Sequence, residues 1–176
     1  MRTEESAIWH ALMTKSQTIS KIRLTPTVEA YVSELVIRAM SARRSTVEST
    51  QDGFLLGSEH GELHTIGDEC LILAGLMPER AIQEEIPVSF FVNMAFRAYT
   101  QLGEDYVDSV YSALAANLVD CIDVLHTLRE IEVGEPCIDP LNAFELWSEA
   151  GSQHAWNYLV DSTNAVPVSA ESFAVH

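Results

Sequence analysis

The amino-acid sequence predicts an all-α fold, a single-domain bundle of six or seven helices, from three observations. Residues 106–131 place apolar side chains at steps of three and four, and this segment contains no glycine or proline. The pairs Thr25-Pro26 and Asp139-Pro140 each combine a capping residue with a proline, which is typical of a helix start. No strand-like alternation of apolar and polar residues is sustained along the chain.

The first helix is expected at residues 4–18, with Thr3 as its cap and glutamates in its first turn. Its apolar residues are Ile8, Leu12 and Ile19, joined by Trp9 and Met13. The second helix begins at Pro26 and carries an apolar face as far as Met40. Residues 41–58 have weak periodicity and two glycines, so we expect a surface connection or a frayed helix there.

Three helices follow in the middle of the chain. One is expected at residues 59–77, ending before Pro78, and one at residues 87–102, where Gly103 supplies a left-handed cap. The apolar stripe then predicts one long central helix over residues 104–131.

The last two helices are marked by their caps. Asp139 precedes a helix that ends at Gly151, and Ser152 caps a short final helix. We therefore expect a helical domain at residues 1–162 and a mobile tail of small and polar residues at 163–176.

Composition and charge narrow the class of protein. The chain has 176 residues, which fits one domain. No apolar stretch approaches the roughly 20 residues that cross a bilayer, and the N-terminus lacks the features of a secretory signal. We expect a cytoplasmic protein with no membrane partner.

The three cysteines, Cys70, Cys121 and Cys137, show no Cys-x-x-Cys spacing, so we expect small buried thiols.

The net charge of −16 is unevenly distributed. Residues 1–44 carry seven Lys or Arg against four acidic residues, a balance of +3, whereas residues 45–176 carry three Arg against 22 acidic residues, a balance of −19. A body this acidic repels phosphate backbones, which argues against nucleic acid as a partner. The basic residues either dock an acidic partner or complement the chain's own acidic face; they are Lys15, Lys21, Arg23, Arg38, Arg43 and Arg44.

Four segments of the chain share motifs with a group of proteins. They are IGDECLILAGLMPERA, SFFVNMAFRAYTQL, LVDCIDVLHTLREI and DPLNAFELWSEAGSQHAWNYL. Together with LTPTVEAYVSEL they resemble a widespread group of uncharacterised proteobacterial proteins of about this size, although Ala95 stands where that group usually has glycine. The resemblance implies a helical, cytoplasmic bacterial protein, and it implies no activity.

Asp68 is the polar residue that we single out as a candidate site. Steps of three, four and seven place it on the same helical face as Leu71, Ile72 and Gly75, where an isolated buried charge is costly. We propose Arg97 as its partner. The alternatives are a buried ion pair that fixes helix register, a cap for a helix that starts at Asp68, and a ligand-binding or catalytic carboxylate.

Two pairs of residues are candidates for a metal site. His60 and His64 are four residues apart and can meet one ion on a helix, but the intervening Gly61 weakens a helix there, and a solvated helix start is the alternative. Asp123 and His126 are three residues apart on the central helix. A di-iron bundle needs a second such pair on another helix, which the sequence lacks.

These observations lead to an expected function. Nucleophile motifs and phosphate-binding glycine loops are absent, so we expect a non-enzymatic protein without a cofactor that binds another protein or a second copy of itself. The aromatic residues Phe90, Phe91, Phe96 and Tyr99 occupy more than one face of their helix, so we expect some to be exposed at an interface.

Three alternatives stay open. One is a small-molecule or metal-dependent enzyme with its site inside the bundle, and another is an acidic body that mimics nucleic acid and occupies a basic partner. Trp147 and Trp156 either anchor the last helices in the core or form a ligand-stacking pair.

Overall fold

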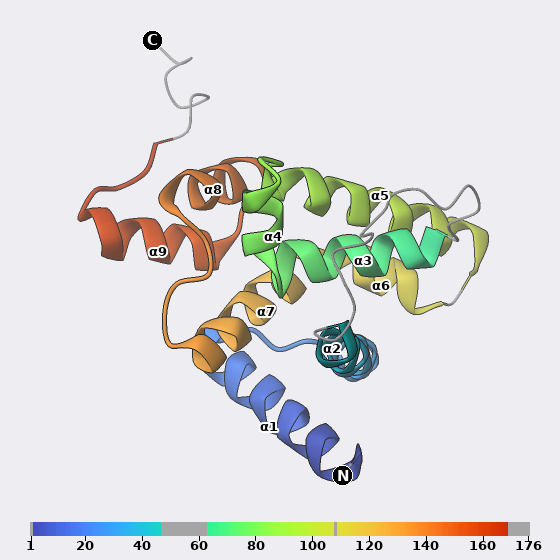
Figure 1. Cartoon of the computed structure of the whole chain (residues 1–176). Helices are drawn as coiled ribbons and strands as arrows, with labels where there is room; N and C mark the ends of the chain where they lie inside the picture. The colour runs from blue at the N-terminus through green and yellow to red at the C-terminus, as the bar shows by residue number, and fades with distance from the viewer. Residues whose placement is uncertain (1, 47–62, 108, 169–176) are drawn as a thin grey trace.

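The computed structural model describes residues 2–46, 63–107 and 109–168 of the chain, and all of their regular structure is helical. This confirms the predicted all-α class. Within those residues there are nine α-helices and one π-helical turn rather than six or seven helices (Figure 1). In chain order they are α1 Arg2–Ser20, α2 Pro26–Thr46, α3 Leu63–Gly75, α4 Pro78–Gln83, α5 Val88–Asp105, α6 Val110–Ala116, α7 Leu118–Val133, α8 Pro140–Glu145, η1 Leu146–Ala150 and α9 Gln153–Thr163.

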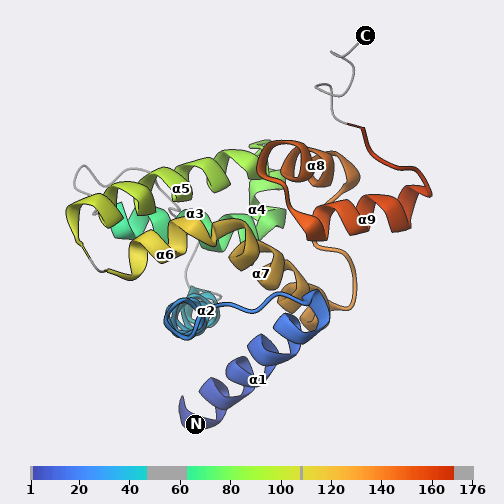
Figure 2. The ribbon, with the colours of Figure 1, turned by 180° about the vertical axis from the view of Figure 1, so that it is seen from behind.

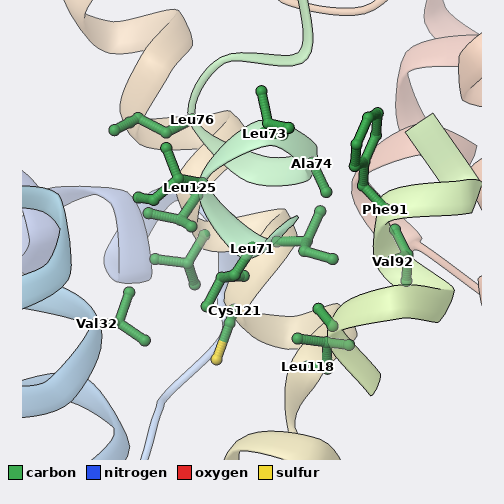
Figure 3. Packing of buried hydrophobic residues seen from close by; sticks show 14 of the residues in the cluster. Val32, Leu71, Leu73, Ala74, Leu76, Phe91, Val92, Leu118, Cys121 and Leu125 are labelled. Carbon is green, nitrogen blue, oxygen red and sulfur yellow. The ribbon is translucent and has the colours of Figure 1, made fainter. Parts of the chain in front are cut away.

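The short helix α3 lies at the centre of the molecule. Its residues from Gly67 to Gly75 are buried except for Glu69, and it packs along α5 and against α7, α2 and α4. Figure 3 shows Leu71 of α3 among side chains of its neighbours, including Val32, Leu118 and Leu125. Because α3 is covered on several sides, the second half of its sequence, from Cys70 to Gly75, is a continuous apolar run.

Small residues let helices approach α3 and α5 closely. A Cβ added at Gly75 would lie 2.9 Å from Cβ of Leu125 on α7, so a larger residue there would push α3 and α7 apart. Gly103 does not cap α5 as predicted, because the helix continues to Asp105. A Cβ at Gly103 would lie 3.0 Å from the backbone nitrogen of Ser112, so this glycine serves the packing of α5 on α6.

The predicted central helix is divided into α6 and α7. The break is at Asn117, whose side-chain amide donates to the carbonyl of Ala113 at 2.8 Å. The backbone nitrogen of Asn117 donates to the same oxygen at 3.0 Å. An asparagine that competes for a backbone acceptor in this way interrupts a helix without any glycine or proline. The stripe also begins later than predicted, since Tyr106 and Val107 are exposed and α6 starts at Val110.

The capping predictions at the C-terminal end are confirmed. The Asp139 side chain accepts from the backbone nitrogens of Leu141 and Asn142 at the start of α8, and the Ser152 hydroxyl accepts from Ala155 at the start of α9. The π-helical turn η1 lies between these caps. The predicted domain boundary at residue 162 falls in the last turn of α9, and residues 169–176 of the predicted tail lie outside the described part of the chain.

The beginning and end of α2 also differ in how well they were predicted. Pro26 starts the helix as expected, and α2 continues past Met40 to Thr46, into the segment 41–58 that was expected to be a surface connection or a frayed helix. Residues 47–58 of that segment lie outside the described part of the chain. No helix in the described part of the chain combines the length and apolar character needed to cross a membrane.

Helix α1 turns a different face to the body from the one that its sequence suggested. Trp9, Met13 and Ser16 are buried, whereas Ile8 and Ile19 of the predicted stripe are exposed. Both views show the N-terminal part of α1 extending away from the other helices, toward the lower edge of the molecule (Figures 1 and 2).

Candidate functional site

The carboxylate of Asp68 lies at the junction of three helices. Its Oδ1 accepts hydrogen bonds from the hydroxyls of Tyr31 on α2, at 2.6 Å, and Tyr99 on α5, at 2.9 Å. Its Oδ2 accepts from Arg38 on α2 at 3.2 Å. We call these four residues the Asp68 cluster. Both carboxylate oxygens thus have donors, which is what a buried charge requires.

Local sequence explains how these side chains meet. Tyr31 and Arg38 are seven residues apart, so they share one face of α2. The Tyr99 ring packs on Gly67, where an added Cβ would lie 2.8 Å from a ring carbon. Burial, together with the neighbouring charge of Asp68, raises the pKa of Tyr99, and burial followed by the hydrogen bond to Asp68 raises the pKa of Tyr31. Both phenols therefore stay protonated and act as donors.

The predicted partner of Asp68 is wrong. Arg97 lies on the exposed face of α5, and the arginine that pairs with Asp68 is Arg38. The face of α5 that meets α3 carries Ala95 and Tyr99, so Arg97 is turned away from it. The capping alternative is also wrong, because α3 begins at Leu63, before Asp68. The Asp68 cluster is a satisfied polar network that ties α2, α3 and α5 together.

The first candidate metal pair is described only in part. His60 lies outside the described residues, so the pair with His64 stays a prediction. His64 is half-buried near the start of α3, with its Nε2 3.4 Å from the hydroxyl of Thr65.

The second candidate pair serves two different helix ends. The buried Asp123 carboxylate accepts from the Ser152 hydroxyl at 2.6 Å and from the backbone nitrogens of Gln153 at 3.0 Å and His154 at 3.2 Å, so it caps α9. The His126 Nε2 bonds the carbonyl of Ala74 at 2.8 Å, in the last turn of α3. In the described part of the chain, no three His, Cys, Asp or Glu side chains are grouped so as to hold a metal ion.

Sequence reasoning missed His154 and Glu130, which lie beside this pair. The His154 Nε2 is 3.0 Å from Oε1 of Glu130, its Nδ1 is 3.4 Å from the Thr127 hydroxyl, and its ring centroid is 5.5 Å from that of His126. We call Asp123, His126, Thr127, Glu130 and His154 the α7–α9 cluster. Nothing in the sequence pairs His154 with a residue 24 positions earlier.

Burial and neighbouring charge set the protonation of the α7–α9 cluster. Complete burial, with the neighbouring His154, lowers the pKa of His126 to about 4, so this ring is neutral at pH 7. Burial raises the pKa of Asp123, against the opposing effect of its hydrogen bonds. Burial would also raise the pKa of Glu130, but the hydrogen bond and charge of His154 outweigh it and lower that pKa.

The α7–α9 cluster borders a cleft of about 310 Å³. The end of α1 and the turn after it form the opposite wall, with Ile19, Lys21 and Ile22. The hydroxyl of Thr127 donates to the carbonyl of Asp123 at 2.9 Å and lies 3.4 Å from Nδ1 of His154. His154 thus contacts both Thr127 and Glu130 of α7 and fixes α9 on that helix.

A second hollow lies at the first turn of α7. This groove, of about 370 Å³, is bounded by α5, the α6–α7 junction and η1. Its apolar lining is Val92, Phe96, Ala115, Ala116, Leu118, Val119 and Ala150. Asp120 and Glu149, both exposed, supply its charges, and Asn93 adds an amide. We call it the α5 groove.

Two of the aromatic side chains of α5 are exposed. Phe96, which lines the groove, is 49% exposed, and Phe90 is 43% exposed, whereas Phe91 and Tyr99 are buried. This confirms the expectation that some of the four aromatic residues are exposed. Trp147 and Trp156 are half-buried with ring centroids 5.0 Å apart, and Trp147 packs against the core.

The remaining sequence candidates can now be placed. Cys70 and Cys121 are buried, Cys137 is half-buried, and all three are free thiols. Burial raises the pKa of Cys70 to about 11, which makes it a poor nucleophile. Of the basic residues, Lys15, Lys21, Arg23 and Arg38 are exposed, and the side chains of Arg43 and Arg44 lie outside the description.

The geometry therefore offers the Asp68 cluster, whose carboxylate oxygens are both paired, the α7–α9 cluster, in which the buried Nδ1 of His126 has no hydrogen-bond partner among the described residues, a polar cleft, and a groove with apolar side chains and an acidic edge. No protein-family model, no curated protein and no solved structure matches the chain, so the resemblance to the proteobacterial group stays a prediction.

Proposed function

We propose that this chain is a non-enzymatic binding protein that receives an apolar, basic segment of a partner protein in the α5 groove. The observation that carries the proposal is Phe96, a large aromatic side chain left about half exposed at an apolar groove with an acidic edge. Exposed aromatic residues beside a hollow are typical of the energetic centre of a protein interface.

The apolar lining supports a partner with aliphatic side chains. Covering the exposed part of Phe96, together with half-buried Val119 beside it, would remove apolar surface from water. Each aliphatic side chain that the partner buries there would contribute about 1.5–3 kcal/mol before the entropic costs of association. The groove is open to solvent, whereas small-molecule sites usually enclose most of their ligand.

The charges support a basic partner. Asp120 and Glu149 line the groove, and the whole chain has a net charge of −16. The sequence after Arg129 contains no Lys or Arg and eight acidic residues, so the wall that η1 contributes has no cation nearby in the chain. An acidic surface of this kind attracts a cationic partner and repels an anionic one.

Titration of the ¹⁵N-labelled protein with a synthetic amphipathic helix of leucine and lysine tests this proposal by NMR. We expect shift changes to concentrate at Asn93, Phe96, Val119 and Glu149. Replacing Phe96→Ser should weaken binding by about tenfold, because the apolar centre of the contact is lost.

Two controls separate groove binding from general attraction of a cation. Val133→Ser removes an equally exposed apolar side chain at the far end of α7 and should leave the affinity unchanged. A helix of leucine and glutamate should not bind. Equal binding of both peptides, or shift changes spread over the surface, would refute the proposal.

An enzyme with a site inside the bundle is the alternative, and one arrangement favours it. Thr127, His154 and Glu130 place a hydroxyl, an imidazole and a carboxylate in sequence along a cleft, as in sites of nucleophilic catalysis. The hydrogen bond from the Thr127 hydroxyl to Asp123 opposes this role, because the proton is directed away from the ring. Elemental analysis of the purified protein tests the metal-dependent version, which stoichiometric iron, zinc or manganese would support.

A further inference from the structure

Helix α1 carries an apolar stripe that the described part of the chain leaves partly uncovered. Ile8 is 58% exposed and Ile19 is 53% exposed, and half-buried Leu12 lies between them on the same face. Exposed Lys15 falls on this face too, seven residues after Ile8. The face from Ile8 to Ile19 is about 17 Å long.

The side chains of this face complement those of the α5 groove in charge. The groove offers apolar side chains and the carboxylates of Asp120 and Glu149, and the stripe offers aliphatic side chains and an ammonium group. Helix α1 itself carries two basic and two acidic residues, so the charge complementarity of the contact rests on Lys15 against Asp120 and Glu149.

We infer that the partner of the α5 groove is a second copy of this chain, whose α1 lies in the groove with Ile8 and Leu12 against Phe96 and with Lys15 beside Asp120 and Glu149. This inference rests on the proposed function of the groove. It adds the identity of the partner.

The helix of one copy cannot reach its own groove. The end of α1 lies against the middle of α7, where Ile19 and Lys21 face Asp123 and Glu130 across the polar cleft. The groove is formed on α5, η1 and the first turn of α7. In both views α1 extends away from α5 toward the opposite edge of the molecule (Figures 1 and 2).

A contact between unlike surfaces does not stop at two copies. Each chain has one helix and one groove, so a dimer still presents a free helix at one end and a free groove at the other. Association of this kind gives rings or open chains, and its extent rises with protein concentration.

Analytical ultracentrifugation of the full chain tests the inference. The average mass of the wild-type protein should rise with concentration beyond that of a dimer. Ile8→Ser, which removes the centre of the stripe, and Phe96→Ser, which removes the centre of the groove, should each weaken association by about tenfold or more. Both side chains are exposed, so circular dichroism and the melting temperature should show that both variants fold.

A mixture of these two variants gives the sharpest result. The Ile8→Ser chain keeps a groove and the Phe96→Ser chain keeps a helix, so the mixture can form one good contact. We expect it to give a dimer and nothing larger. Val133→Ser, the matched control, should associate like the wild type.

The outcomes separate this inference from the proposed function. If the leucine–lysine helix binds the groove while the wild-type chain stays monomeric at every concentration, the self-association is wrong and the groove function stands. If Ile8→Ser abolishes association but Phe96→Ser does not, α1 pairs with another surface and the inference is wrong. If neither peptide binding nor self-association occurs, both proposals are wrong.

Discussion

Single residues in this protein depend on partners that come from distant parts of the chain. Asp68 is buried, and its two oxygens receive donors from Tyr31, Arg38 and Tyr99. Arg38 is 58% exposed, so its ion pair is largely solvated and contributes little to stability. The two phenols, held in a less exposed environment, contribute most of what keeps the carboxylate in place.

Replacing Asp68→Asn should lower the free energy of unfolding by roughly 2–3 kcal/mol, because an amide cannot accept from all three donors. For a chain of this length the melting temperature should fall by about 5–10 °C, measured by circular dichroism. Arg97→Ala is the control and should change the free energy by less than about 0.5 kcal/mol, since Arg97 is exposed and does not pair with Asp68. An unchanged midpoint for Asp68→Asn would contradict the network.

The sequence predicted that Asp68 pairs with an arginine, but it named Arg97 where the structure has Arg38. Helical spacing places a residue on a face, and it gives no information on which face of another helix lies opposite. Arg38 and Arg97 both lie on helices that pack against α3. The packing of Tyr99 on Gly67 determines which face of α5 lies against α3, and this packing is a property of the tertiary structure.

At the scale of elements, the helix starts marked by a capping side chain near the C-terminal end were predicted better than helix faces. Asp139 and Ser152 cap α8 and α9 because a capping side chain bonds residues two or three positions later in its own sequence. The predicted face of α1 is only partly right, because Trp9 and Met13, which were joined to it, are buried, whereas Ile8 and Ile19 are exposed. Where aromatic and long apolar side chains lie next to an apolar stripe, tertiary packing determines which of the two faces is buried.

Helices α3, α7 and α9 are joined by side chains whose charge depends on pH. His126 bonds the last turn of α3, and Asp123 and Glu130 bond α9. In the unfolded chain the His126 pKa is near 6.5, and in the folded chain it is about 4. Between these values the unfolded state binds a proton that the folded state does not, so stability is lost as the pH falls.

We therefore expect acidification from pH 6.5 to 4 to lower the free energy of unfolding by up to roughly 3 kcal/mol through His126. Chemical denaturation at several pH values measures the effect, and His126→Gln should flatten the profile because glutamine has no proton to take up. Glu130, with a lowered pKa, acts in the same direction, whereas Asp123, with a raised pKa, opposes it. His10→Gln, on the exposed face of α1, should keep the wild-type slope.

On the scale of the whole molecule, charge acts on folding and on association with opposite signs. A net charge of −16 on 176 residues produces repulsion within the folded chain, which salt screens. The same salt weakens the attraction between Lys15 of α1 and the acidic groove of a second copy.

Raising sodium chloride from about 10 mM to about 150 mM shortens the screening length from about 30 Å to about 8 Å. We expect a gain of about 1 kcal/mol in folding free energy, seen as a rise of about 2–4 °C in the melting temperature. The average mass in sedimentation should fall over the same range. A melting temperature that falls with salt would mean that ion pairs within the fold outweigh the repulsion.

The one π-helical turn in the described part of the chain sets the length of the connection between α8 and α9. At its end the backbone nitrogen of Gly151 reaches the carbonyls of both Leu146 and Trp147. The wider turn accommodates one more residue than an α-helical turn would. Deleting Ser148 would remove the extra residue, return the segment to regular α-helical winding and change where Glu149 and Ala150 lie against the groove. A change of a single residue in length would thereby alter one wall of the groove.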